Sequence, residues 1–241
     1  MKEKGDFTAD FRLIWIACLA IPVGVTCAFV AVALQRLIGF FTNFFYNLDL
    51  SIPARMIDPN MDTLGLGAIL IPVLGGLIIG LMARYGSERI RGHGIPEAME
   101  AILIGQSRMQ PKVAILKPLS SAISIGSGGP FGAEGPIIMT GGAFGSIMAQ
   151  VFHLSAAERK TLLVAGAAGG MAATFGTPVA AVLLAVELLL FELKPRSLIP
   201  VALAAAAATL VRSLLRDQKN PLWNLGPDPL FAMVPPMVLL A

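Results

Sequence analysis

The sequence predicts an all-α membrane protein with several spans, in which some of the transmembrane helices are broken and tilted. Three observations support this fold class. Of the 241 residues, 56% are hydrophobic and 14% are charged, and the mean hydropathy is +0.76. Soluble domains carry about a quarter charged residues, so most of this surface is suited to lipid. The third observation is a set of apolar runs, some of span length and some too short.

Two runs are long enough to cross a bilayer. Residues 11–41 are apolar apart from Arg12 at their start and Gln35 and Arg36 near their far end, and residues 64–83 contain no charge. A span needs about 20 apolar residues. The first run is too long for the core of a secretory signal, so we expect both runs to remain as spans of an integral, multi-pass membrane protein.

The charges between the runs predict the orientation. Three groups of charges alternate along the chain: basic Lys2, Lys4 and Arg12; acidic Asp49, Asp58 and Asp62 with one Arg55; and basic Arg84, Arg89 and Arg91. Lys and Arg are retained on the cytoplasmic side. We therefore expect a cytoplasmic N-terminus, a cytoplasmic loop over residues 84–91, and a location in the plasma (inner) membrane.

Several classes of function are excluded by the same composition. The net charge is only +3 and the basic residues are scattered, which does not suit nucleic acid. Cys18 and Cys27 would lie about 13 Å apart on one helix, too far to bridge, and two cysteines fit no zinc spacing. We expect no cofactor, no metal site and no enzymatic activity.

Beyond residue 92 the apolar segments shorten. Residues 95–105, 113–125 and 137–152 are interrupted by Gly and Pro, whereas residues 160–175, 178–191 and 198–215 have a helical composition. Short, interrupted segments indicate broken helices that meet at mid-membrane around a substrate. Glycines four residues apart predict close helix packing; they are Gly76 with Gly80, Gly141 with Gly145, and Gly166 with Gly170.

Two glycine-rich motifs precede such segments. Residues 92–97 read Gly-His-Gly-Ile-Pro-Glu, and residues 126–136 read Gly-Ser-Gly-Gly-Pro-Phe-Gly-Ala-Glu-Gly-Pro. Pro favours the first turn of a helix, so a helix is predicted to start near Pro96. A helix N-terminus offers free N–H groups and about half a positive charge to an anion. We expect uncharged dipoles of this kind, rather than fixed cations, to hold a small anion weakly enough for release.

Glu134 adds a carboxylate to the second motif. A carboxylate at a helix N-terminus resembles a bound anion, so it can occupy the site and leave when it is protonated or displaced. An ionisable group deep in an apolar chain is a functional candidate by default. We expect Glu134 to be a gate rather than only a capping carboxylate, whereas Glu97 and Glu100 are expected to complement the dipole of their helix.

The two motifs, followed by the Gly-Ala-rich residues 166–178, resemble the signatures of the chloride channel/transporter (CLC) family, and the resemblance runs from residue 11 to about 215. It implies two inverted halves around an anion path, chloride transport, and a homodimer with contacts near residues 178–187 and 198–215. It also implies that Glu134 is the external gate. The implied anion-binding positions are His93, Gly94, Ile95, Pro96, Gly132, Ala133, Gly135 and Pro136.

The sequence departs from the family pattern at several positions. His93 stands where the family has Ser, so either its ring changes selectivity and pH dependence or only backbone N–H groups bind. Ala133 replaces a basic residue, which weakens the local positive field. Leu188 stands where proton-coupled members often have a second acidic residue, after Glu187. Channel and proton-coupled antiporter both stay open.

The third family signature and a coordinating Tyr are absent, and Tyr46 and Tyr85 do not match the latter. We therefore expect residues 1–241 to be the N-terminal half of a CLC transmembrane domain, with residues 1–10 cytoplasmic and residues 230–241 opening a further helix that is cut off. Such a half needs a C-terminal half to conduct.

The sequence leaves two interpretations open for each of Ser127 and Glu187, and it allows two alternative functions. Ser127 is either a turn residue or a hydroxyl facing the anion path, and Glu187 is either paired with Arg196 or part of the path. An intramembrane serine protease would use Ser127 with His93 or His153 as the base. A non-conducting structural half-subunit is the other alternative.

Overall fold

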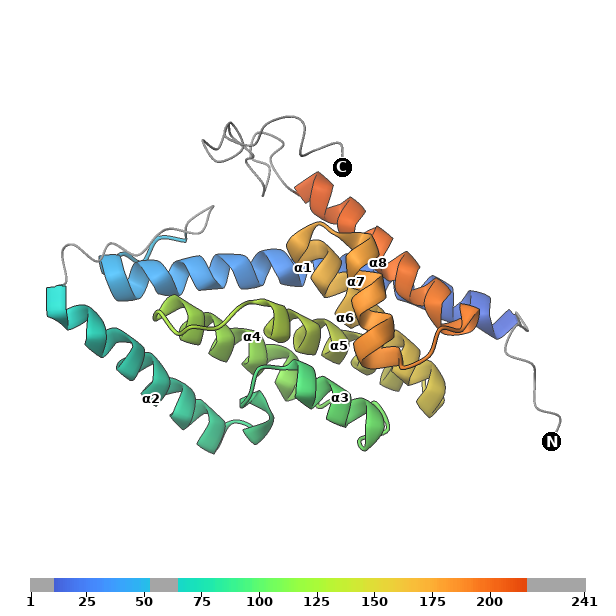
Figure 1. Ribbon diagram of the computed structural model, residues 1–241, viewed down its shortest axis with the longest axis horizontal. Coiled ribbons are helices and arrows are strands. Elements are labelled where there is room, and N and C mark those ends of the chain that lie inside the picture. The colour runs from blue at the N-terminus through green and yellow to red at the C-terminus, as the bar shows by residue number, and fades with distance from the viewer. Residues whose placement is uncertain (1–10, 53–64, 216–241) are drawn as a thin grey trace, which may run out of the picture.

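The structure is a computed structural model that describes residues 11–52 and 65–215, and these residues fold into helices without strands (Figure 1). The predicted fold class is confirmed. The helices are α1 (Phe11–Thr42), α2 (Leu70–Tyr85), α3 (Ile95–Leu103), α4 (Pro111–Gly126), α5 (Glu134–Val151), α6 (Ala156–Phe175), α7 (Pro178–Ala185) and α8 (Pro195–Leu215). Short π-helical turns follow α1 (Asn43–Asn47) and α7 (Val186–Leu190), and 3-10 turns lie at Gly65–Ile69 and Glu88–Ile90.

Three helices in the described ranges are long and apolar enough to cross a bilayer. They cover Arg12–Asn47, Gly67–Tyr85 and Pro195–Leu215. By contrast α3 has 9 residues, which at 1.5 Å per residue reach less than half of a hydrocarbon core about 30 Å thick. The expected mixture of full spans and short helices is therefore present.

Helix α6 lies at the centre of the packing. Its residues from Thr161 to Thr174 are all buried, and α1, α5 and α8 pack around it (Figure 1). Glycines allow the closest approach: a Cβ atom at Gly141 would overlap the carbonyl of Gly166, and one at Gly145 would overlap the carbonyl of Leu162. The predicted packing role is confirmed for these α5 and α6 glycines.

Helix α1 joins the same core through small residues. A Cβ atom at Gly24 would overlap the carbonyl of Ala204 on α8, and the buried Cys27 thiol donates to the Gly166 carbonyl oxygen at 3.2 Å. Cys18 and Cys27 are both free, in agreement with the prediction that they cannot bridge. Close backbone contact thus replaces large side chains along α1, α6 and α8.

The prediction for Gly76 and Gly80 is wrong for the described part of the chain. No atom lies within 4 Å of a Cβ built at either glycine. Helix α2 diverges from the other helices and exposes large apolar side chains, namely Leu70, Val73, Leu74, Leu77 and Leu81. Spacing alone predicted the pair, but this face of α2 meets no other helix here.

Contacts at the helix ends show which ends lie on the same side. Arg12 at the start of α1 forms an ion pair with Glu158 at the start of α6. Lys160, also near that end of α6, donates to the carbonyl oxygen of Leu190 at 2.6 Å. The starts of α1 and α6 therefore lie on one side, together with the turn that ends α7.

The opposite end of α1 meets the junction between α4 and α5. The Tyr46 hydroxyl donates to the carbonyl oxygen of Ser127 at 3.2 Å, and Gly126 lies against Phe41. Beyond this end, hydrogen bonds from the Ser51 hydroxyl and amide lower the pKa of Asp49. The other loop charges, Arg55, Asp58 and Asp62, and the segments 1–10 and 230–241 lie outside the described residues.

Candidate anion site

The first glycine-rich motif forms the start of α3, as predicted. Pro96 is the second residue of the helix, and the preceding Gly94 has a φ of 116°, a conformation that glycine adopts without steric cost. The Glu97 carboxylate folds back and accepts the Gly94 N–H at 2.7 Å. The expectation that Glu97 complements its helix terminus is confirmed.

The second motif forms the start of α5. Glu134 is the first residue of this 18-residue helix, and the Ala133 side chain provides no cap. Within the described ranges, no side chain accepts a hydrogen bond from the N–H groups of Glu134 or Gly135. The N-terminus of α5 is therefore left with donors that suit an anion.

The two motifs touch each other. A Cβ atom at Gly94 would overlap the backbone of Gly135, and one at Gly135 would overlap the carbonyl oxygen of His93 and lie 2.6 Å from its Nδ1. Only glycine allows the backbones to approach this closely. Two helix starts that are about 40 positions apart in the sequence thus meet at one place.

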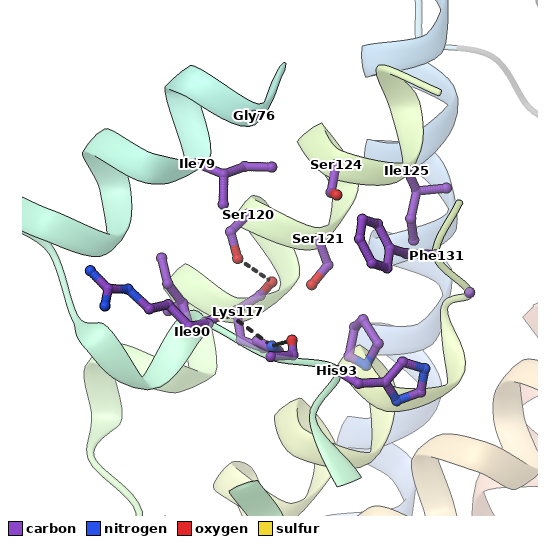
Figure 2. Close-up of a pocket in the computed structure, with 14 residues that line it drawn as sticks. Gly76, Ile79, Ile90, His93, Lys117, Ser120, Ser121, Ser124, Ile125 and Phe131 are labelled. Carbon is purple, nitrogen blue, oxygen red and sulfur yellow. Dashed lines mark hydrogen bonds between the residues drawn. The ribbon is translucent and has the colours of Figure 1, made fainter. Parts of the chain in front are cut away.

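A cavity of about 420 Å³ lies beside this contact. Figure 2 shows side chains from α2, α4 and both motifs around it. Its lining residues are Gly76, Ile79, Ile90, Arg91, Gly92, His93, Lys117, Ser120, Ser121, Ser124, Ile125, Phe131, Gly132 and Pro136. Three of the predicted anion-binding residues, His93, Gly132 and Pro136, are therefore brought to one cavity.

The other predicted positions lie next to the cavity without lining it. Gly94 and Gly135 are buried at the contact between the motifs. Ile95 and Pro96 form the first turn of α3, and Ala133 precedes α5. Glu134 is half-buried between the lining residues Gly132 and Pro136.

A lysine that the sequence reasoning missed lines the same cavity. Lys117 is 1% exposed, and its ammonium group donates to the carbonyl oxygens of Ile90 at 2.9 Å and Gly92 at 2.7 Å. The sequence predicted uncharged dipoles rather than fixed cations at the anion site, and the structure places one lysine side chain in the lining of the cavity. A single charge inside the apolar residues 113–125 was the available signal, because such charges mark functional sites by default.

Ser127 and Glu187 do not reach the cavity. The buried Ser127 hydroxyl donates to the Ser124 carbonyl oxygen at 3.1 Å at the end of α4, which agrees with the turn interpretation. Over the described ranges, neither His93 nor His153 forms a hydrogen bond with it. Glu187 lies on the exposed side of the π-helical turn and forms no ion pair with Arg196 or another described residue.

The fold and the site define an integral membrane protein with broken helices around an open cavity that is lined by apolar residues and a few polar ones. Residues 75–241 match the family described as voltage gated chloride channel. This chain belongs to that family, and the resemblance noted from the motifs is confirmed.

Its relatives support the same assignment. The chain is 35% identical over 160 residues to the voltage-gated ClC-type chloride channel ClcB of Yersinia pseudotuberculosis serotype O:1b (strain IP 31758), covering 65% of this chain and 38% of the relative. It is 29% identical over 218 residues to ClcB of Escherichia coli O139:H28 (strain E24377A / ETEC), covering 89% of this chain and 50% of the relative.

A solved structure has the same fold. A slow cyanobacterial Cl⁻/H⁺ antiporter superposes with a TM-score of 0.66 at 21% sequence identity, over 84% of this chain and 47% of the antiporter. The chain thus spans about half or less of the length of these proteins.

Proposed function

We propose that the full-length protein carries chloride or a similar small anion across a bilayer through a CLC-type pathway. The single observation that supports this function best is the contact between the starts of α3 and α5 beside one cavity. Uncapped N–H groups on α5 and the buried Lys117 both favour a negative ion there. The relatives named as chloride channels agree with this chemistry.

In this proposal the anion is attracted strongly by the charge of Lys117 and weakly by the helix dipoles. Lys117 supplies a full charge in a region of low dielectric, where attraction is much stronger than in water. Two backbone carbonyls already bind its ammonium group, so part of its field is offset. An anion held by this partly offset charge and by helix dipoles can bind and can also be released.

Glu134 is the proposed external gate. It begins α5 between two residues that line the cavity, so its carboxylate can reach the position that favours an anion. The Tyr46–Ser127 hydrogen bond joins the end of α4, in the motif that leads into α5, to the far end of α1. A cytoplasmic N-terminus, which the charge pattern favours, would put that end outside.

The experiment is chloride efflux from liposomes that contain the full-length protein, with Glu134→Gln and Glu134→Ala compared to wild type. We expect flux in the wild type and altered gating or lost pH dependence in both variants. The matched control is Glu100→Gln, because Glu100 is exposed on α3 and does not line the cavity. Unchanged flux in both Glu134 variants would remove the gate. Cleavage of a peptide that depends on Ser127 would instead favour the protease alternative, and absence of any flux would favour a structural subunit.

A parallel recording of proton flux distinguishes channel from antiporter. Relatives are named as channels, whereas the similar structure is an antiporter. Glu187 is the acidic residue that the sequence offers for a proton route, although it does not line the cavity, and Leu188 follows it. Proton movement against a chloride gradient, lost in Glu187→Gln, would identify a coupled antiporter that uses Glu187.

His93 is the proposed determinant of selectivity. His93 is among the residues that line the cavity (Figure 2), which supports a role for its side chain in addition to the backbone N–H groups. Ala133 leaves the nearby helix start without an added positive charge. Anion competition against chloride efflux, compared between wild type and His93→Ser, tests the role of the ring.

We also propose a homodimer in the plasma (inner) membrane, completed by a C-terminal half. Helices α7 and α8 expose apolar side chains, namely Val179, Leu183, Leu210 and Leu214, which suit a subunit interface in lipid. Chemical crosslinking of the full-length protein in its native membrane tests the dimer. Labelling of a cysteine introduced at residue 2 from either side tests the cytoplasmic N-terminus.

A further inference from the structure

One face of α4 is polar along the cavity. Lys117, Ser120, Ser121 and Ser124 all line the cavity, and residues three or four apart share one face of a helix. At one end of this face, Lys117 binds the loop that precedes α3. At the other end, the Ser124 carbonyl oxygen accepts the Gly129 N–H at 2.9 Å in the turn that precedes α5. The polar face of α4 thus connects the two motif loops.

The hydroxyls on this face differ in their partners. The Ser120 hydroxyl donates to the Lys117 carbonyl oxygen at 3.0 Å. Ser121 is 9% exposed and its hydroxyl forms no hydrogen bond with any described residue. Figure 2 shows Ser121 on the side of α4 that faces the cavity, near Lys117. Because this hydroxyl has no partner in the described part of the chain and Ser121 lines the cavity, it is available to a ligand there.

The neighbouring cation determines what kind of ligand suits Ser121. Lys117 lies one helical turn earlier on the same face, and two of its three N–H donors are used by carbonyl oxygens. A ligand that accepts from the Ser121 hydroxyl therefore also lies in the field of the ammonium group. A small monovalent anion satisfies both groups, whereas a cation is repelled.

We propose that the Ser121 hydroxyl donates a hydrogen bond to the transported anion in this cavity. The inference rests on the proposed anion transport and adds a ligand that comes from the middle of α4 rather than from a helix N-terminus. A neutral donor strengthens binding without a second full charge, so it supports exchange of the ion.

The test compares Ser121→Ala with Ser213→Ala in the full-length protein, because the Ser213 hydroxyl on α8 does not line the cavity and donates to the Leu210 carbonyl oxygen of its own helix. Binding of sodium chloride is measured by titration calorimetry, and unfolding temperature is measured on the same samples. We expect about tenfold weaker chloride binding for Ser121→Ala, as for loss of a hydrogen bond to a charged group. Ser213→Ala should keep the wild-type affinity, and Ser121→Thr should recover most of it.

Two outcomes would overturn the inference. One is wild-type chloride affinity in Ser121→Ala. The other is a lower unfolding temperature without a change in affinity, which would assign the hydroxyl to a contact with the C-terminal half. Failure of the proposed function is distinguishable, since then the wild-type protein itself would bind and carry no chloride.

Discussion

The ammonium nitrogen of Lys117 lies 2.7 Å from the carbonyl oxygen of Gly92, so a buried cation on α4 is joined to the loop that starts α3. The same loop contacts the start of α5 through His93 and Gly135. A full positive charge and two helix N-termini are therefore held together by short backbone contacts. Lys117 therefore binds the loop that starts α3 and also places a positive charge beside the cavity.

The first prediction concerns that charge. Lys117→Met keeps most of the side-chain volume and removes the cation, so chloride affinity of the full-length protein should fall roughly tenfold or more. Lys112→Met is the control, because Lys112 is exposed at the start of the same helix. Titration of chloride measures both variants. Equal affinity of Lys117→Met and Lys112→Met would show that the buried charge does not act on the anion.

The second prediction concerns the turn before α5. Tyr46→Phe removes the hydrogen bond to the Ser127 carbonyl oxygen and should lower the free energy of unfolding by about 1 kcal/mol. Tyr85→Phe is the matched control, since Tyr85 is 79% exposed and forms no hydrogen bond within the described ranges. Thermal unfolding in detergent checks both. A similar small effect of the two substitutions would contradict a structural role for Tyr46.

The third prediction concerns helix packing. Gly166→Ala places a methyl group against the carbonyl of Gly141, and overpacking of this kind costs about 1–3 kcal/mol. Gly80→Ala should be neutral or stabilising, because no described atom lies within 4 Å of its Cβ position and Ala favours helix formation. Unfolding curves of the two variants provide the comparison. Tolerance of Gly166→Ala would be evidence against tight contact between α5 and α6.

The fourth prediction concerns the start of α6. Ser155 caps this helix, and its hydroxyl contacts the Glu158 carboxylate at 2.7 Å. Ser155→Ala should cost about 1 kcal/mol and weaken the link to Arg12. Ser213→Ala is the control, because the Ser213 hydroxyl only returns to the Leu210 carbonyl oxygen of its own helix. If both variants unfold at the wild-type temperature, the cap does not stabilise the full-length protein.

Local signals in the sequence predicted most of the helices. Pro96 and the glycines before it located the start of α3, because those residues act through their own backbone conformation. The predicted segment 113–125 lies inside α4. The predicted segment 137–152 ends one residue after α5, and α5 starts three residues earlier than predicted, at Glu134. The difference arises because Gly135 and Pro136 are compatible with the first turn of a helix as well as with a preceding loop.

Contacts between residues far apart in the sequence were harder to predict than the helix starts. The same four-residue spacing brings Gly141 against Gly166 and leaves Gly76 and Gly80 in open space. Nothing in the spacing distinguishes the two cases, since the difference depends on whether another helix lies opposite. Lys117 was missed for a similar reason, because its partners are 25 and 27 positions away.

The sequence by itself determined that this is a membrane protein with two glycine-rich helix starts, one of which carries a carboxylate. Apolar length, Pro and Gly act locally, so composition and order suffice for these features. Only the tertiary structure decided that the two starts touch, that Lys117 binds the loop before the first of them, and that Ser121, unlike Ser120, has no hydrogen-bond partner among the described residues. These features depend on how helices pack, because hydrogen bonds and excluded volume join residues far apart in the chain.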